Sequence, residues 1–212
     1  RDPVAVLSPF HNYHPAPVLT TAHAAYATPL GKIRVRHDLL AAINDEMRSA
    51  GLGGLVQMTA DPEHALEIEL PFLQRTLTND FGLLPLMIRT QQEAVCEFLG
   101  AALARVLAES QALLVASTDL SHFYPVRIAH QLDGSVLECI EQLDPAGIFR
   151  VQAEGRGYAC GASAVVTALH AARQLGADAV KIVHYTTSAA ETGDETSVVG
   201  YGAAVVYRRD AA

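Results

Sequence analysis

The sequence predicts an α/β fold, specifically a single-domain α/β/α sandwich with a mostly parallel central sheet. Short apolar runs that suit buried strands alternate with stretches whose apolar residues recur at helical spacing. Strands separated by helices are typical of parallel pairing, with the helices covering both faces of the sheet. No repeat, low-complexity segment or linker divides residues 1–212, so we expect one domain. The predicted strands are residues 3–7, 32–35, 83–88, 112–117, 180–185 and 198–207.

Local signals define the N-terminal elements. Residues 3–7 form an apolar run that ends in a polar, turn-forming loop at residues 8–15. The Thr-Pro-Leu-Gly sequence at residues 28–31 predicts a turn. Residues 37–50 place apolar side chains at helical spacing, and Gly51 suits the C-terminal end of that helix.

Residues 61–77 predict one bent helix or two short ones. The Asp-Pro pair at residues 61–62 is typical of a helix start. Leucines at spacings of four, three and four residues then form a core-facing stripe. Pro71 lies inside this stretch and should kink or break the helix. His64 and Glu67 lie three residues apart, off the leucine stripe, and therefore share another face.

The second half of the chain continues the alternation of strands and helices. Its last predicted helix is rich in small apolar residues and starts directly after a Cys-Gly pair. The predicted helices are residues 91–109, 127–143, a short one from the Asp-Pro pair at 144–145, and 162–175, and a polar loop is expected at 188–197.

Composition excludes several classes of protein. A net charge of −8 without a Lys/Arg cluster argues against a nucleic-acid or anionic-membrane surface. No apolar run approaches the roughly 18 residues of a membrane helix, and we expect no signal peptide. Three cysteines that form no CxxC pair favour free thiols in a reducing, cytoplasmic setting. The chain begins at Arg1 and runs directly into a strand, so we expect further sequence upstream.

A polar cluster directly after the predicted strand 112–117 is the first candidate site. Residues 117–122 include Asp119 and His122, and open α/β folds place ligand sites at the carboxyl ends of such strands. Asp119 could orient His122 or act as an acid or base beside it. The alternative is that residues 117–119 cap the next helix and that His122 is an ordinary surface histidine.

His11 and Cys160 are the other candidate ligands. His11 follows the predicted strand 3–7 as His122 follows the predicted strand 112–117. Cys160 precedes Gly161 at a predicted helix start, which should lower the pKa of its thiol. A thiolate with imidazoles suits zinc, copper(I) or iron. His64 could support the ligands or transfer protons. The alternatives are that Cys160 is an inert buried residue and that His64 only makes structural hydrogen bonds.

Five short motifs follow one another along the chain: residues 7–11 (Leu-Ser-Pro-Phe-His), 28–31 (Thr-Pro-Leu-Gly), 63–73 (Glu-His-Ala-Leu-Glu-Ile-Glu-Leu-Pro-Phe-Leu), 117–122 (Ser-Thr-Asp-Leu-Ser-His) and 159–161 (Ala-Cys-Gly). In these motifs and their order the chain resembles the Memo family, also called AmmeMemoRadiSam system protein B, from residue 4 nearly to the last strand.

The resemblance implies a fold similar to the class III extradiol dioxygenases and a redox-active metal, iron (Fe²⁺) or copper, with zinc less favoured. It implies that His11 and Cys160 are metal ligands and that His122 is a third site histidine close to the metal. His64 and Asp119 match residues of the surrounding pocket. The family's Pro-His-Ala-Gly-Tyr segment, which carries a further ligand, is not present in this sequence. The family's Arg and Pro after Cys-Gly are here Ala162 and Ala164, which weakens any substrate-anchoring role of that loop.

With this resemblance, the leading hypothesis is a metalloprotein that binds iron or copper through His11, His122 and Cys160, with the activity of a non-haem iron dioxygenase-like oxidoreductase. We expect His122, His64 and Asp119 to transfer protons, and dioxygen to oxidise an unknown small molecule or peptide. A thiolate ligand differs from the two-histidine, one-carboxylate triad of ordinary oxygenases. Two alternatives stay open, a non-enzymatic peptide-binding adaptor or metal-handling protein and a zinc-dependent hydrolase. The second family name also suggests a partner in a radical-SAM system.

Overall fold

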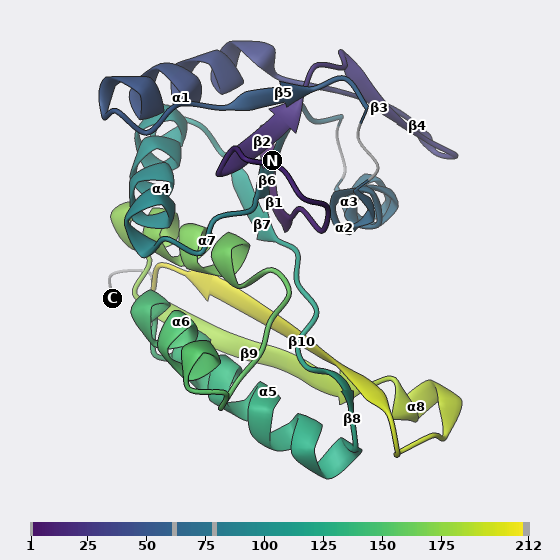
Figure 1. The fold of residues 1–212 in the computed structure, drawn as a ribbon. Coiled ribbons are helices and arrows are strands. Elements are labelled where there is room, and N and C mark those ends of the chain that lie inside the picture. Colours follow the sequence, from purple (N-terminus) through teal and green to yellow (C-terminus); the bar gives the residue numbers. More distant parts are fainter. Residues whose placement is uncertain (1, 61–62, 78–79, 210–212) are drawn as a thin grey trace.

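The protein is described by a computed structural model that covers residues 2–60, 63–77 and 80–209. Within these residues a central sheet has the strand order β5-β2-β6-β1-β7 (Figure 1). β1 pairs in parallel with β6 and β7, and β2 pairs in parallel with β5, whereas β2 and β6 are antiparallel. The expected mostly parallel central sheet is therefore confirmed. Its strands are β1 (Val4–Pro9), β2 (Val18–Thr21), β5 (Val56–Met58), β6 (Leu83–Ile88) and β7 (Leu113–Ala116).

The last two predicted strands form a separate antiparallel sheet instead of extending the central one. In this second sheet β10 lies between β8 and β9. A further antiparallel ribbon joins β3 to β4. The bounds are β3 (Ala25–Thr28), β4 (Gly31–Arg34), β8 (His122–Tyr124), β9 (Ala179–Thr187) and β10 (Val198–Tyr207).

Helices cover both faces of the central sheet, and the alternation of side chains along β1 shows why. Ala5 and Leu7 pack in the core beneath α1, α4 and α7, whereas Val4 and Val6 pack with Leu66 of the α2–α3 layer. Figure 1 shows α1 and α4 on one side of β1 and β6, and α2 and α3 on the other. The helices are α1 (His37–Ser49), α2 (His64–Glu67), α3 (Glu69–Thr76), α4 (Glu93–Leu107), α5 (Val126–Glu141), α6 (Pro145–Ala153), α7 (Ala162–Gln174) and α8 (Ala189–Thr192). None of them, over the residues described, has the length and apolar character needed to cross a membrane.

The segment predicted as one bent helix or two short ones is two short helices, α2 and α3, which meet at Ile68. Pro71 falls in the first turn of α3, where its missing N–H costs no helical hydrogen bond. The expected Asp-Pro start at residues 61–62 lies outside the described residues. Glu63 caps α2, because its carboxylate accepts hydrogen bonds from the backbone N–H groups of His64 and Ala65.

Candidate metal site

A cavity of about 670 Å³ lies where the central strands end. His11, His64, Asp119, His122 and Cys160, the residues singled out in the sequence, all line it. Since β1 and β7 are parallel neighbours, the chain leaves both strands at the same edge of the sheet, and residue 11 and residues 117–122 follow directly. The segment before α7 brings Cys160 to the same place. The topology therefore explains why residues far apart in the sequence share one cavity.

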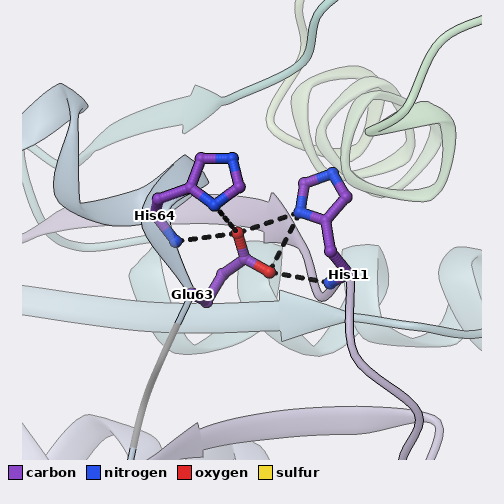
Figure 2. A group of neighbouring side chains, drawn as sticks. All are labelled: His11, Glu63 and His64. Atoms are coloured by element: carbon purple, nitrogen blue, oxygen red, sulfur yellow. Dashed lines mark hydrogen bonds and ion pairs between the residues drawn. The ribbon is translucent and has the colours of Figure 1, made fainter.

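One wall of the cavity is organised by the buried carboxylate of Glu63 (Figure 2). This carboxylate accepts hydrogen bonds from the backbone N–H of His11 at 2.7 Å and of Ala65 at 2.9 Å. The ring Nδ1 of His11 lies 3.0 and 3.1 Å from its two oxygens, and Nδ1 of His64 lies 3.4 Å from Oε1. Glu63 thus fixes a loop residue, a helix start and two imidazoles at once.

The ionisation of Glu63 decides which face of His11 is available to a ligand. Burial alone would raise the pKa of Glu63, but hydrogen bonds from Ala65 and from the backbone and ring of His11 outweigh it and lower the pKa. An ionised carboxylate only accepts hydrogen bonds, so in the neutral imidazole of His11 the proton lies on Nδ1 and the lone pair on Nε2. Figure 2 shows the Nε2 atoms of His11 and His64 pointing away from Glu63 on the same side. The two rings are nearly parallel, at 12°, with centroids 5.0 Å apart.

A second group consists of Asp119, His122 and Cys160, whose candidate ligand atoms all lie within 4.8 Å of one another. The backbone N–H of Asp119 donates to Sγ of Cys160 at 3.1 Å, and the backbone N–H of Cys160 donates to the carbonyl oxygen of Asp119 at 3.1 Å. The Asp119 carboxylate lies 3.6 Å from Nε2 of His122. These two hydrogen bonds between Asp119 and Cys160 hold the sulfur beside a carboxylate and an imidazole.

Gly161 allows the two segments of this group to approach so closely. A Cβ at this position would lie 2.3 Å from the carbonyl oxygen of Ser117 and 2.8 Å from Cβ of Thr118. The backbone of Gly161 has a φ of −96°, which any residue can adopt, so the requirement is steric. The glycine of the Cys-Gly pair is therefore needed for the contact between the Cys160 and Asp119 segments.

The prediction that Cys160 has a lowered thiol pKa is wrong for the metal-free protein. Burial raises the pKa of Cys160, and this effect outweighs the hydrogen bonds from Asp119 and Thr118 that favour the thiolate. The nearby Asp119 carboxylate raises it further. Moreover α7 begins at Ala162 with Gly161 as its N-cap, so Cys160 lies outside the first helical turn. The thiol is therefore protonated at neutral pH until a cation replaces the proton.

The structure also divides the predicted ligands and adds residues that the sequence did not single out. Among the described residues, His11 falls in a group with Glu63 and His64, whereas His122 and Cys160 fall in the group with Asp119. That one ion binds His11, His122 and Cys160 together stays a prediction. Glu63 was not among the candidate site residues; its place directly before His64 in the 63–73 motif was the available signal. No sequence pattern indicated that Tyr201 of β10 also lines the cavity.

The fold and cavity define a class: an α/β protein with a possible metal-binding site of His/Glu/His or Asp/His/Cys type. Comparison with known proteins adds the family. A family model described as Memo-like protein matches residues 1–205, so the chain belongs to the Memo family, as the motifs indicated.

Named relatives agree with this assignment. A MEMO1 family protein of Nitrosopumilus maritimus is 31% identical over 94% of this chain and 72% of its own length. A MEMO1 family protein of Methanosarcina barkeri is 28% identical over 97% of this chain and 76% of its own length. One of Saccharolobus solfataricus is 31% identical over 96% of this chain and 71% of its own length.

Proposed function

We propose that this protein binds an iron or copper ion in the cavity and oxidises a small molecule or peptide with dioxygen. The observation that carries the proposal is the second group, in which a sulfur, an imidazole and a carboxylate have ligand atoms within 4.8 Å of one another. A soft sulfur with imidazole suits iron and copper better than magnesium or calcium, which prefer oxygen ligands. The residues present therefore fit a transition metal. Such an ion, when bound, supplies one-electron chemistry and a Lewis acid.

We assign the metal ligands to Cys160, His122 and His11. Cys160 contributes the sulfur, which its backbone link to Asp119 holds in place. His11 contributes Nε2, which has the lone pair of the neutral imidazole when Nδ1 donates to Glu63. Because the Cys160 thiol has a raised pKa, metal binding must release a proton from it, and metal affinity should increase with pH.

We assign proton transfer to His122, Asp119 and His64. The Asp119 carboxylate is half exposed and lies 3.6 Å from Nε2 of His122, so the pair can exchange a proton with the cavity. His64 has a highly exposed side chain and shares the Glu63 carboxylate with His11. His122 thus has two proposed roles, ligand and acid–base partner of Asp119, and the experiment separates them.

Metal analysis of protein purified without oxygen tests the ligand assignment. We expect the wild type to carry about one iron or copper ion per chain and Cys160→Ala to lose at least about 90% of it. The matched control is Cys96→Ala, since Cys96 is a buried cysteine of α4 that does not line the cavity. Equal metal content in Cys160→Ala and the wild type would disprove the assignment.

Oxygen uptake tests the redox proposal. Iron- or copper-loaded protein should consume dioxygen with an oxidisable substrate, and zinc-loaded protein should not. His122→Ala that keeps its metal but loses uptake assigns His122 to proton transfer; loss of the metal assigns it as a ligand. Hydrolysis by the zinc form without oxygen uptake by the others would support the hydrolase instead.

A non-enzymatic, partner-binding role is the second candidate, and the aromatic surface beside His122 favours it. Phe123 is 77% exposed and has a φ of 65°, an uncommon conformation for a non-glycine residue. Tyr158 lies edge-on to His122, with ring centroids 5.6 Å apart, and is also exposed. Exposed aromatic groups are typical of binding surfaces. Binding of a peptide to the metal-free protein that is lost in Phe123→Ala would support this role. Peptide binding unchanged by this substitution would exclude this surface as the binding site.

A further inference from the structure

Asp133 of α5 is a buried carboxylate outside the cavity lining, yet it contacts the segment that carries the site. Its side chain is fully buried. Oδ1 accepts a hydrogen bond from the backbone N–H of Ser121 at 2.8 Å, one residue before His122. Oδ2 accepts a hydrogen bond from the hydroxyl of Tyr185, on β9, at 2.7 Å. A single carboxylate therefore links α5, the second sheet (β8-β10-β9) and the segment that leads into His122.

Gly200 of β10 provides the space for this carboxylate. A Cβ at Gly200 would lie 1.9 Å from Oδ2 of Asp133. The backbone of Gly200 holds the same segment, because its carbonyl accepts from Leu120 N–H at 2.9 Å and its N–H donates to the carbonyl of Ser121 at 2.9 Å. Hydrogen bonds to β10 of the second sheet thus hold residues 120 and 121, while hydrogen bonds with Cys160 hold Asp119.

Burying a carboxylate is costly unless several donors satisfy it, and an apolar residue of similar size would often stabilise a core as well. Residues 117–121 lie between β7 and β8 and outside any regular helix or strand. Their geometry must therefore come from specific contacts such as those of Asp133. We infer that Asp133 is a positioning residue for Asp119 and His122, with Tyr185 fixing the carboxylate and Gly200 leaving room for it. The inference rests on the proposed function.

Tyr185→Phe is the least disruptive test, because it removes only the hydroxyl that donates to Asp133. The matched control is Tyr207→Phe, which removes a hydroxyl from a tyrosine on β10 that is 43% exposed. Asp133→Asn keeps an oxygen for the Ser121 N–H, and Asp133→Ala removes both contacts. The first measurement is the rate at which the Cys160 thiol of metal-free protein reacts with an alkylating reagent, followed by mass spectrometry to separate the three cysteines. The second is the affinity for Co²⁺ and the near-ultraviolet cobalt–thiolate band.

We expect Tyr185→Phe and Asp133→Ala to change the Cys160 alkylation rate by about threefold or more, because the donor from Asp119 to the sulfur moves with the segment. We expect them to weaken Co²⁺ binding by about tenfold and to shift the thiolate band, with Asp133→Asn restoring most of the affinity. The inference would be overturned if Tyr185→Phe and Asp133→Ala kept the wild-type alkylation rate, Co²⁺ affinity and thiolate band, as the control does, and differed only in a lower melting temperature. If Asp133→Ala does not fold, Tyr185→Phe decides. An altered alkylation rate in protein whose wild type binds no Co²⁺ would support the positioning role while the proposed metal function fails.

Discussion

The steric requirement at Gly161 gives the sharpest prediction for the site. In Gly161→Ala the added methyl would lie 2.3 Å from the Ser117 carbonyl oxygen, whereas an ordinary contact begins at 3.4 Å, so the two backbones must part by about 1.1 Å (3.4 minus 2.3). This separation weakens the hydrogen bonds from Gly161 N–H to Thr118 Oγ1 and from Asp119 N–H to Cys160 Sγ. Overpacking costs about 1–3 kcal/mol and each of the two hydrogen bonds contributes about 1 kcal/mol, so we expect a loss of about 3–5 kcal/mol if both are broken.

Urea unfolding of metal-free protein measures this loss, and a chelator competition measures metal affinity, which should fall by about tenfold or more. Gly134→Ala is the matched control, because a Cβ there meets nothing within 4 Å and Gly134 lies inside α5. Replacing a helical glycine by alanine stabilises by about 0.5–1 kcal/mol, so the control should shift the other way. If Gly161→Ala changed stability by less than about 0.5 kcal/mol and kept its metal, the close approach of the two segments would not be required.

Three further predictions concern the Glu63 carboxylate and the Cys160 thiol. Glu63→Gln should weaken metal binding by about tenfold in a chelator titration, because an amide cannot accept from all the N–H groups that contact Glu63; unchanged affinity would remove Glu63 from the site. The folded-state pKa of Glu63 is below its usual value of 4.5, so its contribution to stability is present above that pH and lost as the pH falls through the lower value. Urea midpoints of the wild type should therefore fall on acidification more steeply than those of Glu63→Gln, and parallel curves would contradict this. Metal-free Cys160 should be alkylated slowly at pH 7 and faster as the pH rises past 9, because burial raises its pKa; rapid reaction at neutral pH would show a thiolate instead.

Much of the fold could be predicted because hydrophobic runs report burial directly. Residues 83–88 form β6 with the predicted bounds, since every one of them is buried in the sheet. β2, β3, β5 and β8 were missed because they are only three or four residues long and lack a distinctive pattern. β9 and β10 were recognised as strands but assigned to the wrong sheet. Only a polar loop and the four-residue α8 connect them, too short for a parallel crossover, so they pair as an antiparallel hairpin.

The candidate site was predictable only as far as strand ends and family motifs reach. His11 and His122 could be expected to share a cavity because each follows a strand of one parallel sheet. The buried partners could not be expected. Glu63 and Asp133 are ordinary acids in the sequence, and only tertiary packing places His11 beside one and Tyr185 beside the other. The prediction of a lowered pKa for Cys160 was wrong for the same reason, because the burial that raises this pKa depends on neighbours that sequence spacing does not reveal.

The donors that satisfy Glu63 imply that this side of the site is assembled by folding, before any ion binds. Most of them are backbone N–H groups, of His11, His64 and Ala65, which exist whatever the side chains are. The carboxylate can be buried and ionised only when the loop after β1 and the start of α2 have met in this arrangement. Once they have met, Nδ1 of His11 is held against the Glu63 carboxylate and Nε2 points away from it. The cost of orienting His11 is therefore borne by folding rather than by metal binding, which is the condition for a preorganised ligand.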